Sequence, residues 1–337
     1  MRTLVISDLH LGGRLHHDVL MRPAALGRLL DAIDSVDRLV LLGDIVELIE
    51  GNPEHAMIVA EPVLRTLGER LGEAREVIFV PGNHDGPLVR GWARARGSQL
   101  TPDSSVPLDA TPALVRVSSW LAPAIVHVHY PGVWLSETVW ATHGHYLDRH
   151  LLPESAFGIA RGLLGRLPHG RAAPSDYEHL RRPSVARASR WMPQPLAKLV
   201  DDIAELGRAS TMPGVRRRLL HRQMAPLIAM LLGAQMSRAS IPALARVVHR
   251  LGVEADWVVF GHVHRLGPLA IDRRSQWQGP MGRPQIVNTG SWVYEPLLVH
   301  RATPPHPYWP GGAVLLEPGG EPRPVALLDE LVAGALR

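Results

Sequence analysis

Five short polar motifs each follow directly after an apolar, strand-like run. They are Asp8-Leu9-His10, Gly43-Asp44, Gly82-Asn83-His84-Asp85, His143-Gly144-His145 and Gly261-His262-Val263-His264. Carboxylate, imidazole and amide groups of this kind are the donors that divalent metals such as manganese, iron and zinc prefer. The glycines beside them allow tight turns and close approach of the backbone. The sequence therefore predicts a metal site assembled from residues far apart along the chain.

The runs that precede these motifs belong to alternating strands and helices. In the first 85 residues the strands are predicted at 3–7, 38–42 and 76–80, with helices at 24–35 and 53–71. This βαβαβ order implies parallel strands joined by right-handed crossovers. The carboxyl ends of such strands share one edge of the sheet, where ligand sites form. Further strands are predicted at 124–130, 139–142, 257–260, 285–288 and 313–316.

Composition excludes several classes of chemistry. The 337 residues include no cysteine, which rules out disulfides, zinc-thiolate sites and cysteine nucleophiles. The first apolar run is broken at once by Asp8, so no signal peptide is predicted. No stretch reaches the ~18 apolar residues of a membrane span. These features favour a cytoplasmic protein. The length of the chain is compatible with two domains or with one α/β domain that carries an insertion.

A basic, helical segment separates the fourth motif from the fifth. Residues 145–254 carry 17 Arg and Lys against 8 Asp and Glu, a net charge of +9, whereas the rest of the chain has a net charge of −5. Helical periods predict helices at 196–206 and from an N-cap at Ser240 to Leu251. The stretch 168–195, rich in Pro, Arg and Ser, is predicted to form a loop or to be poorly ordered.

The same segment suggests contact with a lipid surface. Its apolar run 227–232 follows a cluster of basic residues, Arg216, Arg217, Arg218 and Arg222. Basic residues beside apolar ones are typical of helices that lie on anionic membranes. The alternative is that the apolar residues pack as an ordinary helical core and that water surrounds the arginines.

In order, the five motifs resemble those of the calcineurin-like metallophosphoesterase superfamily. The family pattern is D-x-H, GD-x-x-D/E, GNH-D/E, H-G or HGH, and GHxH, which read here SDLH, GDIVE, GNHD, THGH and GHVH. The resemblance covers residues 1–145 and 255–292. It implies an α/β fold with a calcineurin-like β-sandwich flanked by helices. Residues 1–149 and 253–337 would form this domain, and 150–252 would be a helical, basic insertion that caps it.

The resemblance also implies two divalent ions, Mn, Fe or Zn, and a role for each site residue. The ligands of the first ion would be Asp8, His10 and His264. Those of the second would be Asn83, His143 and His262, with Asp44 bridging both ions. His84 would contact the phosphate and protonate the leaving oxygen, and Asp85 would orient His84. A metal-bound hydroxide would attack the phosphorus in line with the leaving group.

Other residues near the motifs have two interpretations. His145 either touches the phosphate or fills the turn. Glu47, which ends GD-x-x-D/E, is interpreted as a structural hydrogen-bond partner rather than a metal ligand. His127 and His129 share one face of a strand, where packing is favoured over a role as rival ligands.

The predicted activity is hydrolysis of a phosphate ester or pyrophosphate on a lipid-linked or nucleotide substrate. The layout is similar to that of bacterial UDP-2,3-diacylglucosamine pyrophosphatases. Those enzymes often carry Arg where this chain has His84, and HGD where it has His143-Gly144-His145. The alternatives are a nuclease, a cytosolic phosphodiesterase and a non-catalytic metal-bound scaffold. The expected partners are a phosphorylated small molecule or lipid and, through 150–252, the inner face of the membrane; a nucleic-acid partner stays open.

Overall fold

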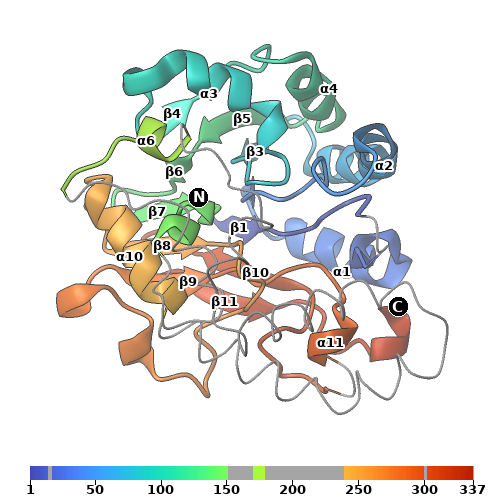
Figure 1. The fold of residues 1–337 in the computed structure, drawn as a ribbon. Coiled ribbons are helices and arrows are strands. Elements are labelled where there is room, and N and C mark those ends of the chain that lie inside the picture. The colour runs from blue at the N-terminus through green and yellow to red at the C-terminus, as the bar shows by residue number, and fades with distance from the viewer. Residues whose placement is uncertain (14–16, 151–169, 179–238, 300–301, 337) are drawn as a thin grey trace, which may run out of the picture.

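Two β-sheets lie at the centre of the molecule, between helices (Figure 1). The computed structural model describes residues 1–13, 17–150, 170–178, 239–299 and 302–336. The helices of these ranges are α1 (Pro23–Ile33), α2 (Pro53–Leu71), α3 (Arg90–Arg96), α4 (Pro112–Trp120), α6 (Pro174–Glu178), α10 (Ile241–Arg250) and α11 (Pro296–Val299). A short 3₁₀ helix, η4 (His145–Arg149), follows the HGH motif.

The larger sheet has seven strands in the order β11-β10-β1-β2-β3-β5-β4. Its parallel centre consists of β1 (Thr3–Ile6), β2 (Arg38–Leu41), β3 (Glu76–Phe79) and β5 (Ile125–Tyr130). Antiparallel strands complete both edges: β10 (Gly312–Leu316) with β11 (Arg323–Ala326), and β4 (Ser104–Ser105). The βαβαβ prediction is therefore confirmed in this sheet.

The smaller sheet has four strands in the order β6-β7-β8-β9. These are β6 (Gly132–Trp134), β7 (Val139–Thr142), β8 (Trp257–Phe260) and β9 (Gln285–Asn288). The last three are parallel, although about 115 residues separate β7 from β8 in the sequence. Two segments on either side of the predicted insertion thus become neighbours in one sheet.

Side-chain alternation divides the core into three layers. In β1, Leu4 and Ile6 pack with the apolar residues of α1, α2 and α4, whereas Val5 belongs to the cluster between the two sheets. In β8, Val259 faces the larger sheet, and its neighbour Val258 packs beneath α10. Because successive side chains of a strand point to opposite faces, burial on both faces requires continuous apolar runs. The predicted β-sandwich flanked by helices is confirmed.

Most predicted elements have the predicted bounds within one or two residues. The helix 53–71 and the strands 139–142, 257–260 and 285–288 match the structure at both ends. The shorter elements α3, α4, β6 and β11 were not predicted. For α4 a signal existed, because Thr111 caps its N-terminus by accepting a hydrogen bond from Leu114 N at 3.1 Å.

Two predictions about the insertion need correction. Ser240 occupies the predicted N-cap position of α10, but it has helical backbone angles and its side chain makes no capping hydrogen bond. Within the stretch predicted as a loop, residues 174–178 form α6, whose Asp176 accepts a hydrogen bond from Ala173 N. The other predictions for the insertion, the helix 196–206, the four arginines and the run 227–232, lie outside the described residues.

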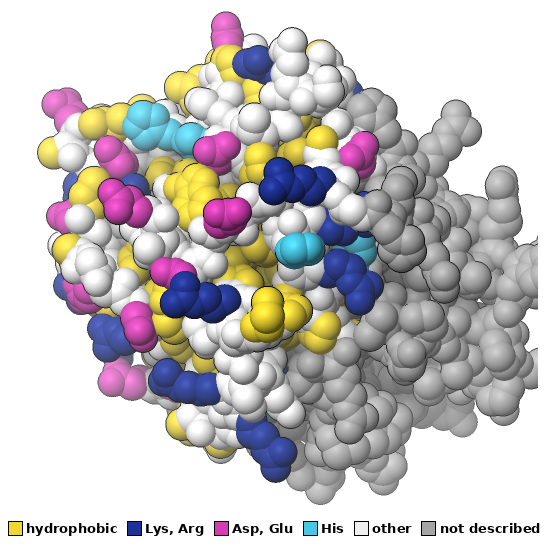
Figure 2. Space-filling model, turned by 90° about the vertical axis from the view of Figure 1, so that its left-hand side faces the viewer, with side chains coloured by type: hydrophobic (Ala, Val, Ile, Leu, Met, Phe, Trp, Pro, Cys, Tyr) yellow, Lys and Arg dark blue, Asp and Glu magenta, His cyan; other side chains and the backbone are white. Residues whose placement is uncertain are grey.

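On the face seen in Figure 2, acidic and basic side chains of the described residues are interspersed, and they form no patch of a single charge. Among the described helices, none has the length and apolar character needed to cross a membrane.

We expect Gly68→Ala to destabilise the fold by about 1–3 kcal/mol through overpacking. A Cβ at this position of α2 would lie 2.4 Å from the carbonyl oxygen of Leu121, a backbone atom at the end of α4. The matched control is Gly27→Ala in α1, where nothing lies within 4 Å of the added Cβ. That change should stabilise by roughly 0.5–1 kcal/mol. Urea unfolding of both variants measures the difference, and equal stabilities would contradict the close α2–α4 contact.

Candidate metal centre

The predicted ligands converge at the carboxyl ends of five strands. Asp8 and His10 follow β1, Asp44 follows β2, Asn83 follows β3, His143 follows β7, and His262 and His264 follow β8. Three groups of His and Asp have ligand atoms within 4.8 Å of one another: Asp8, His10 and His264; Asp44, His143 and His262; and His10, Asp44 and His84. The first two groups match the predicted division of ligands, and the third was not predicted.

The backbone is left-handed at most of these positions. Among the described residues, six other than glycine have positive φ, and five of them are predicted ligands: Asp8, His10, Asp44, His262 and His264, at 54°, 45°, 54°, 70° and 56°. Such conformations are uncommon outside glycine and cluster at functional sites. The turn after each strand thus directs a polar side chain back over the edge of the sheet.

Asp44 lies at the centre of the site with almost no exposed surface. Its Oδ2 is 3.2 Å from His143 Nε2 and 3.9 Å from His10 Nε2, and its Oδ1 accepts a hydrogen bond from His84 N at 2.8 Å. Burial raises the pKa of this carboxyl, but His143, His10 and His84 together outweigh burial and lower the pKa well below its ordinary value. A Cβ on Gly82 would lie 2.4 Å from Asp44 Oδ1, so only glycine leaves room for the carboxylate.

Asp8 is the second buried carboxylate among the predicted ligands. Its Oδ1 lies 3.2 Å from His264 Nε2, and His262 N donates to its Oδ2 at 2.9 Å. Ser7 Oγ also donates to Asp8. Burial raises the pKa of Asp8, and His264 and His143 together more than offset this, so the net shift is downward. The first and last motifs are therefore joined through one carboxylate.

His143 is oriented by the backbone. Its Nδ1 lies 3.0 Å from the carbonyl oxygen of Leu42, which accepts the Nδ1 proton and leaves Nε2 facing Asp44 and Asn83 Oδ1, 3.1 Å away. Burial lowers the pKa of His143, but the carboxylates around it, first Asp44, raise it to about 10. On the other side of the site, His262 Nε2 lies 3.0 Å from Asp148 Oδ1. Asp148 was not predicted, because nothing in the spacing of η4 links it to the motifs.

Glu47 connects two histidines of the site. Its carboxylate lies 2.9 Å from His10 Nδ1 and 2.7 Å from His84 Nδ1, and it also accepts from the backbone N–H groups of Ile49 and Glu50. Burial raises its pKa, but the bonds from His10 and His84 outweigh this and lower it strongly. The same bond from Glu47 raises the pKa of His84 against the effect of burial. The interpretation of Glu47 as a hydrogen-bond partner agrees with these contacts.

Asp85 does not bond to the side chain of His84, which it was predicted to orient. Its carboxylate accepts hydrogen bonds from Ile45 N and Gly82 N, and among the described residues the carboxylate bonded to the His84 side chain is that of Glu47. Asp85 instead ties the loop after β2 to the loop after β3. Burial first, and then the nearby Asp44, raise its pKa to about 7.

The remaining histidines fall into two places. His145 is beside the site, with its ring centroid 5.6 Å from that of His143. His127 is exposed on β5, and His129 Nδ1 lies 3.2 Å from the carbonyl oxygen of Asp103. Neither His127 nor His129 belongs to the groups of potential ligands in the described part of the chain.

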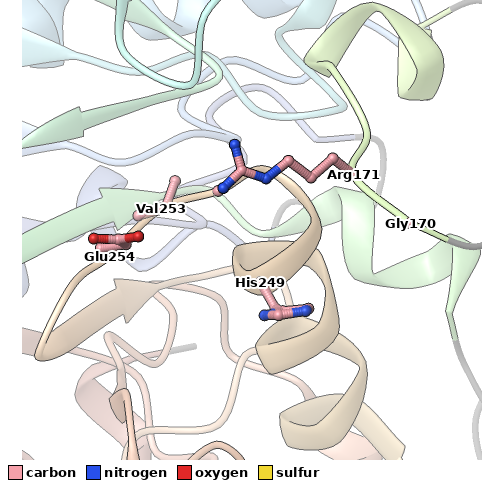
Figure 3. A pocket seen from close by; sticks show the side chains of 6 residues that line it. Gly170, Arg171, His249, Val253 and Glu254 are labelled. Atoms are coloured by element: carbon pink, nitrogen blue, oxygen red, sulfur yellow. The ribbon is translucent and has the colours of Figure 1, made fainter.

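A cavity of about 150 Å³ lies elsewhere, between the segment before α6 and the end of α10. Figure 3 shows His249 on α10, Val253 and Glu254 on the loop after it, and Arg171 reaching over from the facing segment. None of the predicted site residues lines this cavity, so it is separate from the candidate metal centre.

The donor set fits divalent ions. Two buried carboxylates, one amide oxygen and four imidazoles face one another, and water cannot compensate buried charges of this kind. Oxygen and imidazole donors without thiolate suit manganese, iron and zinc. The residues that would hold such ions are those predicted: Asp8, His10 and His264 on one side, Asn83, His143 and His262 on the other, and Asp44 between them.

The chain is similar to known phosphoesterases. A family model described as calcineurin-like phosphoesterase matches residues 1–182. A UDP-2,3-diacylglucosamine hydrolase of Shewanella baltica (strain OS155) is 37% identical over 107 residues, which cover 31% of this chain and 41% of that protein. A protein of the same name from Shewanella oneidensis is 36% identical over the same length, with the same coverage. The similarity therefore spans about two-fifths of the length of these relatives.

Among solved structures, one described as a cold-active protein-tyrosine phosphatase of a psychrophilic Shewanella species has 14% sequence identity to this chain. The superposition covers 94% of this chain and 75% of that one with a TM-score of 0.31, a likeness too weak to bear on function.

Replacing Glu47 with Gln should weaken divalent-metal binding by roughly 10–100-fold, because partners of ligating histidines hold ring orientation and basicity. Glu50→Gln is the matched control, since Glu50 is exposed three residues away. Calorimetric titration with Zn²⁺ compares the two variants with the wild type. Equal affinities for Glu47→Gln and Glu50→Gln would show that Glu47 does not support His10.

Proposed function

Because this chain belongs to the calcineurin-like phosphoesterase family, we propose that it hydrolyses a phosphate ester or pyrophosphate with two divalent metal ions. The observation that carries the proposal is the position of Asp44, a buried carboxylate that belongs to two groups of potential ligands, one with His143 and His262 and the other with His10 and His84. A carboxylate between two sets of donors can contact both ions of a two-metal site. When bound, the ions would lower the pKa of a water and neutralise charge on the phosphoryl group.

The residues of the chain prepare the site for this chemistry. Glu47 accepts from Nδ1 of both His10 and His84, so each ring keeps its proton on Nδ1 and turns Nε2 away from Glu47. For His10, Nε2 lies 3.3 Å from His264 Nε2, among the other ligands. For His84, the raised pKa favours a proton on Nε2 as well. His84 can then donate that proton to the leaving oxygen.

A lipid-linked nucleotide is the substrate class we favour. The support is the similarity to proteins named UDP-2,3-diacylglucosamine hydrolase, together with the basic character of residues 150–252. A basic insertion suits an anionic substrate, and it suits peripheral contact with an anionic membrane through 150–252. A cytosolic phosphodiesterase and a nuclease are the alternative activities, and His84 beside the complete ligand set argues against a metal-bound scaffold.

A hydrolysis panel with Mn²⁺ tests the activity and separates these substrates. It should contain p-nitrophenyl phosphate, bis-p-nitrophenyl phosphate, cyclic nucleotides, single-stranded DNA, UDP-sugars and a lipid-linked UDP-sugar. We expect cleavage of the UDP-linked pyrophosphate, with release of UMP, and higher kcat/KM for the lipid-linked form. Turnover of cyclic nucleotides or DNA alone would favour an alternative, and no turnover with Mn²⁺, Fe²⁺ or Zn²⁺ would reject the proposal.

Asp44→Asn should lower activity by orders of magnitude and reduce the metal content below two ions per chain. The amide has one oxygen where the carboxylate has two, so it cannot serve both donor sets equally. Asp109→Asn, an exposed acid in the loop before α4, is the control for handling and purity. Elemental analysis beside turnover measures both effects, and full activity with at most one ion would disprove the two-metal proposal.

His84→Ala separates proton donation from metal binding. The variant should keep its metal but lose roughly 10²–10⁴-fold in turnover on substrates with poor leaving groups. The loss should shrink for p-nitrophenolate, which needs little protonation. His127→Ala, an exposed histidine of β5, is the matched control. Loss of metal would assign His84 to the ligands, and an equal loss of turnover on good and poor leaving groups would show that His84 does not act as the proton donor.

A further inference from the structure

A network of polar groups connects the insertion to the turn that carries His143. Glu178, the last residue of α6, accepts hydrogen bonds from the hydroxyl groups of Tyr130 and Tyr146, the latter at 2.7 Å. Tyr130 Oη in turn lies 3.3 Å from Nε2 of His145. The rings of Tyr146 and Tyr177 stack at 4.5 Å with an angle of 5° between their planes. Figure 1 shows α6 next to α3 and β4, on the side of the molecule where β5 ends.

The direction of these bonds fixes the protons of His145. The single proton of Tyr130 is donated to the Glu178 carboxylate, so its oxygen can only accept from His145. His145 Nε2 must therefore be the protonated nitrogen of the neutral ring. Nδ1 is left as a bare acceptor. It is shielded from solvent, and no group of the described residues bonds to it.

The position of Nδ1 limits what can bind it. A nitrogen without a proton cannot donate to a phosphate oxygen, which excludes the phosphate contact considered for His145 in that tautomer. Both ring nitrogens also fall outside the potential ligand groups found among the described residues. The ring nevertheless lies beside His143, a predicted ligand. The group that suits this position is an O–H group, which can donate a hydrogen bond to Nδ1.

We propose that Glu178, acting through Tyr130, holds His145 as the Nε2–H tautomer, so that Nδ1 accepts a hydrogen bond from a water or hydroxyl bound beside the metal centre. Glu178 and Tyr130 are positioning residues. Because Glu178 belongs to the predicted insertion, the insertion thereby determines which nitrogen of His145 carries the proton. The role of Nδ1 in turnover rests on the proposed function, whereas the tautomer of His145 is a property of the fold.

Imidazole ¹⁵N NMR tests the tautomer without reference to activity. The sample is Zn²⁺-loaded protein with ¹⁵N-labelled histidine, and the His145 signals are those lost in His145→Gln. Two-bond ¹H–¹⁵N correlations should show Nε2–H in the wild type, and Tyr130→Phe should shift the ring toward the other tautomer. Tyr146→Phe removes the other hydroxyl on Glu178 and should leave the His145 signals as in the wild type. Nδ1–H in the wild type, or equal responses to the two variants, would overturn the proposal.

Kinetics identifies the donor to Nδ1. His145→Gln should lower kcat roughly tenfold on bis-p-nitrophenyl phosphate, which has no hydroxyl group, if the donor is water. A rise in KM confined to UDP-sugars would identify a substrate hydroxyl instead. Unchanged kcat and KM on both substrates would refute the role of Nδ1. A wild type without turnover on any substrate would refute the proposed function, while the NMR result would still decide the tautomer.

Discussion

The structure around the site depends on keeping one carboxylate, that of Asp44, charged in a place that water does not reach. Burial alone would raise its pKa, and the imidazoles of His143, His10 and His84 together overcome that effect. Space for the carboxylate comes from Gly82, where any side chain would collide with it. The neighbouring strands, turns and histidines together stabilise the negative charge of this buried carboxylate.

The residues around Asp44 come from the ends of strands in two sheets. The parallel strands β1, β2 and β3 of one sheet and β7 and β8 of the other each end in a turn that carries a predicted ligand. Five of these ligands adopt left-handed backbone angles, which cost of order 1 kcal/mol or more each and persist only when the surroundings impose them. Packing on both faces of both sheets supplies that rigidity, because the strand positions cannot shift without disrupting a core layer.

Sequence reasoning succeeded where burial leaves a continuous apolar run. The strands 139–142 and 257–260 are buried on both faces, and their bounds follow directly from the pattern. It failed where the direction of a side chain depends on a turn. Asp85 follows His84 in the chain, yet its carboxylate binds the backbone of another loop, and Glu47 bonds to His84 instead. Similarly, Asp148 contacts His262, and Glu178 contacts Tyr146, only because η4 and α6 fold close to the site, which no local spacing reveals.

The central claim is that two ions lie on either side of Asp44. X-ray diffraction from Mn²⁺-soaked crystals, with anomalous differences measured at the manganese edge, tests it most directly. The account predicts two anomalous peaks, one beside Asp8, His10 and His264 and the other beside Asn83, His143 and His262, with Asp44 contacting both. A single peak, or peaks away from Asp44 in crystals of active protein, would contradict it.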